Sequence, residues 1–135
     1  MKYTVSFENN TTATIYADSM REAELQAYCA YGKDAIGLGI SGENKDFMMT
    51  CCVRAWEDYT LSKPQFKDFT LDDVFYHLVA VAYAWVNFPT ETGEEWDYED
   101  GCKYKYERIG KEGKEYLKKH DRLGNYMESI GWDRW

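Results

Sequence analysis

The sequence predicts an α+β protein whose residues 1–135 form a single domain. Three observations predict this class: strand-like alternation near the N-terminus, an apolar segment of helical character at residues 71–88, and a hairpin signal near residue 100. We expect an N-terminal ββαβ unit, followed by two or three helices and an acidic β-hairpin around residues 94–106. A chain of 135 residues can bury a hydrophobic core without metal ions or disulfide bonds.

The predicted unit opens with a β-hairpin. Residues 2–8 alternate apolar and polar side chains with period two, which is typical of a half-buried strand. Asn9 and Asn10 follow, and asparagine tolerates the positive φ that a tight turn requires. Residues 12–17 alternate in the same way and are expected to form the second strand.

A helix and a third strand are expected next. Ser19 and Glu22 have the spacing of a capping box, which marks the start of a helix, and Gly32 closes that helix. Residues 35–40 then read as a short buried strand. Residues 47–60 fit both a helical and an alternating pattern; the helix is the preferred interpretation and the strand stays open.

The second half of the chain carries clearer signals. Thr70 is expected to cap a largely apolar helix over residues 71–88, which would lie at the centre of the core. Asp100-Gly101 is a strong signal for a two-residue hairpin turn. In that register Trp96 and Tyr98 share a face with two lysines, Lys103 and Lys105. Residues 111–130 are expected to form one amphipathic helix or two short ones.

The formal net charge of −8 is unevenly distributed along the chain. Counting Lys and Arg against Asp and Glu, residues 1–50 carry −3, residues 51–100 carry −8 and residues 101–135 carry +3. An acidic protein repels nucleic-acid phosphates, so direct binding of DNA or RNA is not expected. The same charge favours a basic protein partner.

The acidity is most concentrated between residues 91 and 100, which hold six carboxylates and no base. One interpretation is a solvated hairpin, partly neutralised by Lys103 and Lys105 across the strand pair. The other is a partner-binding surface on which carboxylates take the place of nucleic-acid phosphates and two aromatic residues serve as anchors. The candidate partner-binding residues are Glu91, Glu94, Glu95, Trp96, Asp97, Tyr98, Glu99 and Asp100.

The leading hypothesis is therefore a non-catalytic binding or inhibitor protein that presents an acidic surface to a basic, nucleic-acid-handling partner. A phage-type inhibitor of host defence, such as an anti-CRISPR protein acting as a DNA mimic, fits this description at the level of class. No membrane partner is expected. A third hypothesis is a homo-oligomeric accessory protein whose many aromatic residues form a self-interface.

The second hypothesis is a small enzyme or ligand-binding protein with a pocket near His77. Asp73 lies one helical turn before His77 and could orient its imidazole for acid–base chemistry, although a lone histidine on an apolar helix is more often a hydrogen-bonded core residue. No catalytic residue is assigned. No metal or cofactor is expected, because the cysteines and histidines lack ligand spacing and no phosphate-binding glycine motif is present.

The four cysteines are expected to be reduced, because they include no CxxC motif and no signal peptide precedes the first strand pattern. The expected location is the cytoplasm. The longest apolar run, residues 74–86, is too short to span a bilayer. The four cysteines of the chain are Cys29, Cys51, Cys52 and Cys102.

Overall fold

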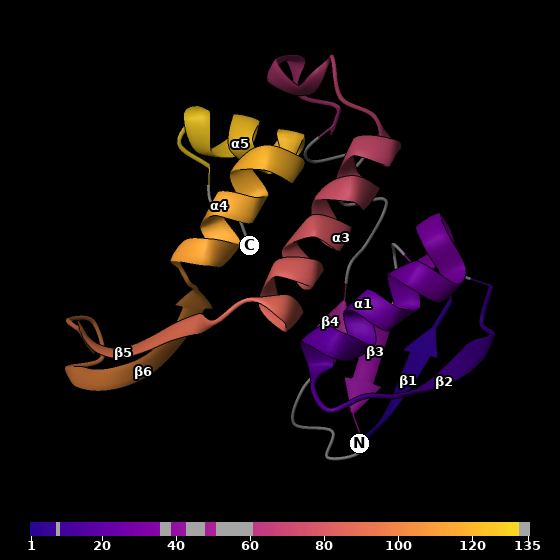
Figure 1. The fold of residues 1–135 in the computed structure, drawn as a ribbon, viewed down its shortest axis with the longest axis horizontal. Coiled ribbons are helices and arrows are strands. Elements are labelled where there is room, and N and C mark those ends of the chain that lie inside the picture. Colours follow the sequence, from indigo (N-terminus) through magenta and orange to yellow (C-terminus); the bar gives the residue numbers. More distant parts are fainter. Residues whose placement is uncertain (8, 36–38, 43–47, 51–60, 133–135) are drawn as a thin grey trace.

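The computed structural model describes residues 1–7, 9–35, 39–42, 48–50 and 61–132. These residues form both α-helices and antiparallel strands, and the strands make two separate sheets, which confirms the α+β class. Figure 1 shows the larger sheet on one side of the molecule, the helices in the middle and on the far side, and the smaller sheet projecting from them.

The larger sheet has four antiparallel strands in the order β2-β1-β3-β4. Asn10 has a φ of 66° in the turn between the first two strands, so the predicted N-terminal hairpin is confirmed. Tyr3, Val5 and Ile15 are buried, as the alternating pattern requires. The strands are β1 (Lys2–Ser6), β2 (Thr12–Tyr16), β3 (Gly39–Gly42) and β4 (Met48–Thr50).

Helix α1 (Met20–Tyr31) begins and ends where the capping residues predict. The Ser19 hydroxyl accepts the Glu22 N–H at 3.1 Å, and the Glu22 carboxylate accepts the N–H of Asp18 at 2.9 Å. Gly32 has a φ of 61° at the C-terminal end, a conformation that glycine adopts without steric cost.

Two predicted segments differ from the structure. Gly32–Ala35 forms a 3₁₀ turn and β3 begins only at Gly39, so the strand predicted over 35–40 starts too early. The preferred helix over 47–60 is wrong for Met48–Thr50, which pair with β3 because that neighbour satisfies their backbone groups. Residues 36–38 and 51–60 lie outside the described residues, so the detailed ββαβ arrangement stays a prediction.

Three further α-helices lie among the described residues, and of the two predictions for residues 111–130 the structure adopts two short helices. After a 3₁₀ turn at Pro64–Phe66 come α3 (Leu71–Asn87), α4 (Lys111–His120) and α5 (Arg122–Ser129). The Thr70 N–H donates to the Asp73 carboxylate at 2.8 Å at the start of α3. No helix in the described part of the chain is long and apolar enough to cross a membrane.

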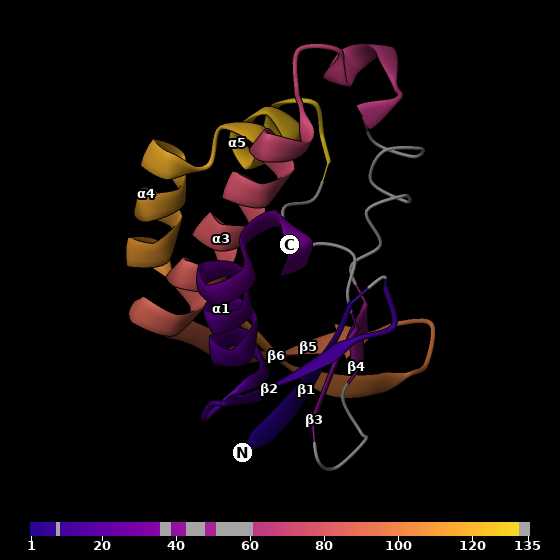
Figure 2. The ribbon, with the colours of Figure 1, turned by 90° about the vertical axis from the view of Figure 1, so that its right-hand side faces the viewer.

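Helix α3 is central because it contributes to both hydrophobic clusters. One cluster joins the larger sheet, α1, α3 and α5, and the other joins α3 to α4 and to Ile109. Figure 2 shows α1 between the sheet and α3, with α4 and α5 on the opposite side of α3. The predicted central position of this helix is therefore confirmed.

Candidate functional site

The candidate site is a two-stranded hairpin that we call the hairpin arm, residues 90–109. Its strands β5 (Thr90–Asp97) and β6 (Cys102–Ile109) pair antiparallel through eight consecutive residue pairs. The arm extends away from the helices (Figure 1). At its base Ile109 is buried in the second hydrophobic cluster, and the Gly110 N–H donates to the Pro89 carbonyl at 3.2 Å.

The turn of the arm has four residues, 98–101, so the predicted two-residue turn is wrong. Asp97 explains the difference. One of its carboxylate oxygens accepts the N–H groups of Glu99 and Asp100 at 2.9 and 3.2 Å, and its carbonyl accepts the Gly101 N–H at 2.8 Å. Asp97 thus accepts hydrogen bonds from three backbone N–H groups of the turn. These bonds favour the four-residue turn over a two-residue one.

The longer turn shifts the strand register by two residues, which preserves the face that each strand residue occupies. Trp96 is paired with Lys103, and Glu94 with Lys105, so Trp96 lies on the predicted lysine face. Tyr98 leaves that face because it now belongs to the turn.

The opposite face of the arm holds an internal polar network around Glu95. The Tyr104 hydroxyl donates to Glu95 at 2.7 Å, and Arg108 donates to its other oxygen at 2.6 Å. These bonds, first that from Tyr104 and then that from Arg108, hold the pKa of Glu95 below its ordinary value. The guanidinium of Arg108 also lies 4.0 Å from the centre of the Tyr106 ring. Glu95, like Asp97, therefore has a structural role within the arm.

The remaining predicted residues point outward. Trp96 is 48% exposed and Tyr98 is 89% exposed, with ring centroids 6.5 Å apart, so the end of the arm presents two adjacent aromatic rings. Among these predicted residues, the exposed carboxylates that form no ion pair with any described residue are Glu91, Glu94, Glu99 and Asp100.

The arm as a whole holds seven carboxylates and three cations, and three of these carboxylates, Glu95, Asp97 and Glu107, are hydrogen-bonded within it. An open hollow of about 530 Å³ lies on the arm, lined by side chains of both strands, among them Glu94, Lys105 and Glu107. The outward surface therefore combines exposed carboxylates that form no ion pair among the described residues with two large, exposed aromatic side chains.

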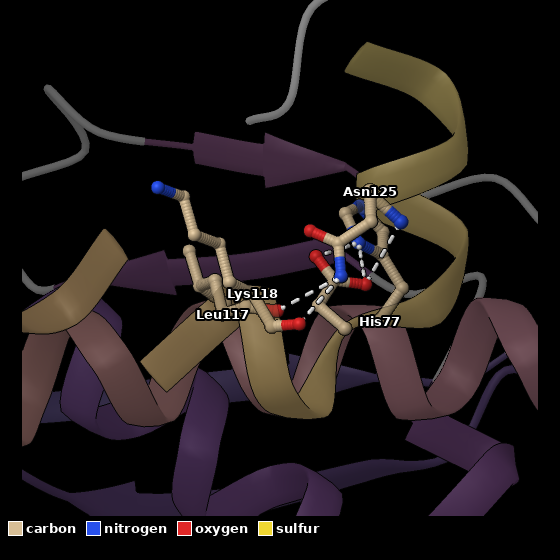
Figure 3. Close-up of polar contacts among 6 residues, drawn as sticks. His77, Leu117, Lys118 and Asn125 are labelled. Carbon is tan, nitrogen blue, oxygen red and sulfur yellow. Dashed lines mark hydrogen bonds and ion pairs between the residues drawn. The ribbon is translucent and has the colours of Figure 1, made fainter. Parts of the chain in front are cut away.

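His77 belongs to a different, buried site. Its Nδ1 donates to Asp121, with both carboxylate oxygens at 2.8 Å, and neither side chain has any exposed surface. Asp121 also accepts the Gly124 N–H at 2.9 Å as the N-cap of α5. Figure 3 shows this group together with Asn125, whose amide donates to the carbonyls of Leu117 and Lys118 at the end of α4.

The His77–Asp121 pair joins α3 to the junction of α4 and α5. The prediction of a hydrogen-bonded core histidine is confirmed, but Asp73, the partner weighed from the sequence, instead caps α3 and forms an ion pair with Arg122. The signal for Asp121 was its place between two helical segments, where an aspartate serves as an N-cap. Since His77 has no exposed surface, it does not contact the open hollow of the arm.

The described residues contain no group of three or more His, Cys, Asp or Glu side chains placed to hold a metal ion. Cys29 and Cys102 are exposed free thiols, and Cys51 and Cys52 lie outside the described residues. Glu24 is buried in α1, where burial raises the pKa of its carboxyl group and Tyr28 donates to it at 3.0 Å.

Comparison of the chain with protein-family models, with curated proteins and with solved structures finds no match. The candidate site therefore has to be interpreted from its own chemistry.

Proposed function

We propose that the protein is a non-catalytic binding protein that uses the hairpin arm to occupy a basic site on a nucleic-acid-handling protein partner. The single observation that carries this proposal is the end of the arm. There, exposed Trp96 and Tyr98 adjoin carboxylates that have no cationic partner among the described residues. A phage-type inhibitor such as an anti-CRISPR protein acting as a DNA mimic is the class that this proposal favours.

An arm that only projects into solvent has physical costs that binding to a partner would offset. A two-stranded hairpin is marginally stable in water by itself, so one that projects from a domain has a cost in ordered backbone. Large exposed aromatic side chains add unfavourable contact with water, whereas the same rings contribute strongly to affinity when a partner buries them. Uncompensated carboxylates accelerate association with a basic surface and select against acidic ones.

The test begins with the protein itself as bait in a lysate of cells that contain its target. Each captured protein is identified, purified and measured directly for binding at about 50 and 200 mM salt, with and without duplex DNA as a competitor. We expect the captured protein to be a basic nucleic-acid-binding protein. Its affinity for the bait should fall as the salt concentration rises, and duplex DNA should compete with the bait for its binding site.

Two matched variants then locate the surface. Glu91→Lys/Glu94→Lys/Glu99→Lys reverses three exposed carboxylates of the arm that have no structural bond among the described residues. Asp34→Lys/Asp68→Lys/Glu115→Lys makes the same change in net charge on exposed residues outside the arm. We expect the first variant to lose at least about tenfold in affinity and the second to lose much less. Equal losses, or none in either variant, would refute the arm as the binding surface.

A further inference from the structure

The outer edge of β5 is unpaired among the described residues, because the smaller sheet contains only β5 and β6. This edge is eight residues long, whereas the edge strands of the larger sheet, β2 and β4, have five and three residues. Alternate N–H and C=O groups of an edge strand point away from the sheet and can pair with another strand. The arm therefore offers a long strand template.

The two edges of the arm differ in how they are protected. Natural proteins discourage unwanted pairing at a sheet edge with lysines, prolines or bulges. Strand β6 carries three cations, Lys103, Lys105 and Arg108, whereas β5 carries four carboxylates and has no lysine, arginine or internal proline. The eight strand pairs follow one another without a bulge. The edge of β6 is therefore defended, and that of β5 is open to a strand of positive charge.

We propose that the β5 edge binds an extended, basic segment of a partner protein by β-strand addition. This inference rests on the proposed function and specifies its mode of binding. Backbone hydrogen bonds to β5 supply affinity, and the side chains on the two faces of the arm supply specificity. The occupant is thus a strand-forming segment with cations at alternate positions, not a folded basic surface.

The arrangement of side chains indicates where those cations lie. Glu94 and Trp96 are neighbours on the exposed face of the arm, so a lysine or arginine beside them meets both a carboxylate and the face of an indole ring. On the opposite face Glu95 is already bonded to Arg108 and Asp97 to the amides of the turn, which leaves Glu91 as the carboxylate free to meet a cation of the added strand. A period-two pattern of cations on the Glu94 face follows.

A second copy of the chain is a poorer occupant. Pairing β5 with β5 of another copy sets carboxylates against carboxylates, and like charges across strands are destabilising. Pairing β5 with β6 of another copy matches the charges but is a head-to-tail contact, which leaves a free edge at each end. The net charge of −8 opposes such growth.

The test uses the intact protein and three synthetic peptides, each acetylated, amidated and made of four Lys-Thr repeats. One peptide is unmodified, the second is N-methylated at every lysine and the third at every threonine. In an added strand only one of these two sets of N–H groups faces β5. We expect the unmodified peptide to bind, one methylated peptide to lose at least about tenfold in affinity, and the other to stay within about threefold.

Hydrogen exchange supplies a second readout. Amides of β5 should gain protection when the unmodified peptide binds, and Glu91→Lys/Glu94→Lys should weaken that binding. Affinities of the two methylated peptides within about threefold of each other would overturn strand addition, as would failure of the unmodified peptide to bind. Concentration-dependent self-association of the protein alone, with protection of β5, would assign the edge to a second copy and overturn the proposal.

Failure of this inference is distinguishable from failure of the proposed function. If methylation has no effect but the purified partner still loses affinity for the charge-reversed arm, the arm binds through its surface and only strand addition is wrong. If the purified partner ignores the charge reversal, the proposed function itself is wrong.

Discussion

Asp121→Ala should cost a large part of the stability of this protein. The substitution removes a carboxylate that accepts from His77 at 2.8 Å and from the Gly124 N–H at 2.9 Å, in a site without exposed surface. Leaving the buried His77 N–H without its acceptor costs about 1–3 kcal/mol, and loss of an N-cap adds about 1 kcal/mol. We therefore expect the free energy of unfolding to fall by about 3 kcal/mol.

Urea denaturation at neutral pH, followed by circular dichroism, measures this change directly. In a thermal scan the same loss corresponds to a decrease in Tm of about 10 °C for a domain of this size. Asp121→Ser separates the two contributions. A serine at the N-cap still accepts the Gly124 N–H but gives up the carboxylate, so this variant should be about 1 kcal/mol more stable than Asp121→Ala.

Two results would refute this reasoning. One is a loss below about 1 kcal/mol for Asp121→Ala, the size expected of an ordinary surface substitution. The other is additivity with His77→Leu. If the pair is the source of the cost, the double variant should be clearly less destabilised than the sum of the two single variants. Asp68→Ala, at an exposed residue, is the control and should change little.

Three further changes test other parts of the structure. Gly93→Ala would place a Cβ where the Tyr106 hydroxyl lies, so the arm should lose about 1 kcal/mol of local stability, seen as faster amide exchange in β5; unchanged exchange would contradict the contact. Glu24→Gln tests a carboxyl whose folded pKa is raised by burial, so its stability contribution is full below the ordinary value of 4.5 and is lost as the pH rises through the higher folded pKa. The variant should therefore gain stability relative to wild type as the pH rises above about 4.5 in urea titrations, and a difference that does not change with pH would contradict this. Tyr104→Phe removes the main cause of the low pKa of Glu95, so that pKa should move back toward its ordinary value in an NMR titration; an unchanged pKa would show that Arg108 alone accounts for it.

Short sequence signals correctly located the elements that are determined by interactions between residues close together in the chain. Ser19 and Gly32 mark the ends of α1 because caps satisfy backbone groups within one turn of the helix. Asp100-Gly101 located the hairpin arm because the conformation of a turn also depends on its own residues. The length of its turn escaped prediction because the side chain of Asp97 competes for the loop amides, and the dipeptide signal does not include that residue.

Features that depend on distant residues could not be predicted in the same way. Strand β4 exists because Met48–Thr50 pair with β3, and its three residues are too few for periodicity to separate strand from helix. The partner of His77 is 44 residues away in the sequence, so only the packing of α3 against the α4–α5 junction identifies Asp121. Within the candidate site, composition located the carboxylates, but only the structure separated those that bond within the arm from those that point outward.

The positions of the two hydrophobic clusters determine how freely the sequence of the arm can vary. No residue between 90 and 108 belongs to either cluster of the described residues, and the arm joins the core through Ile109 at its base. Substitutions along the arm should therefore leave most of the folding free energy untouched, and under the proposed function they alter recognition. If the arm binds a partner as proposed, sequence changes in that partner can be matched by single substitutions in the arm while the rest of the protein stays folded.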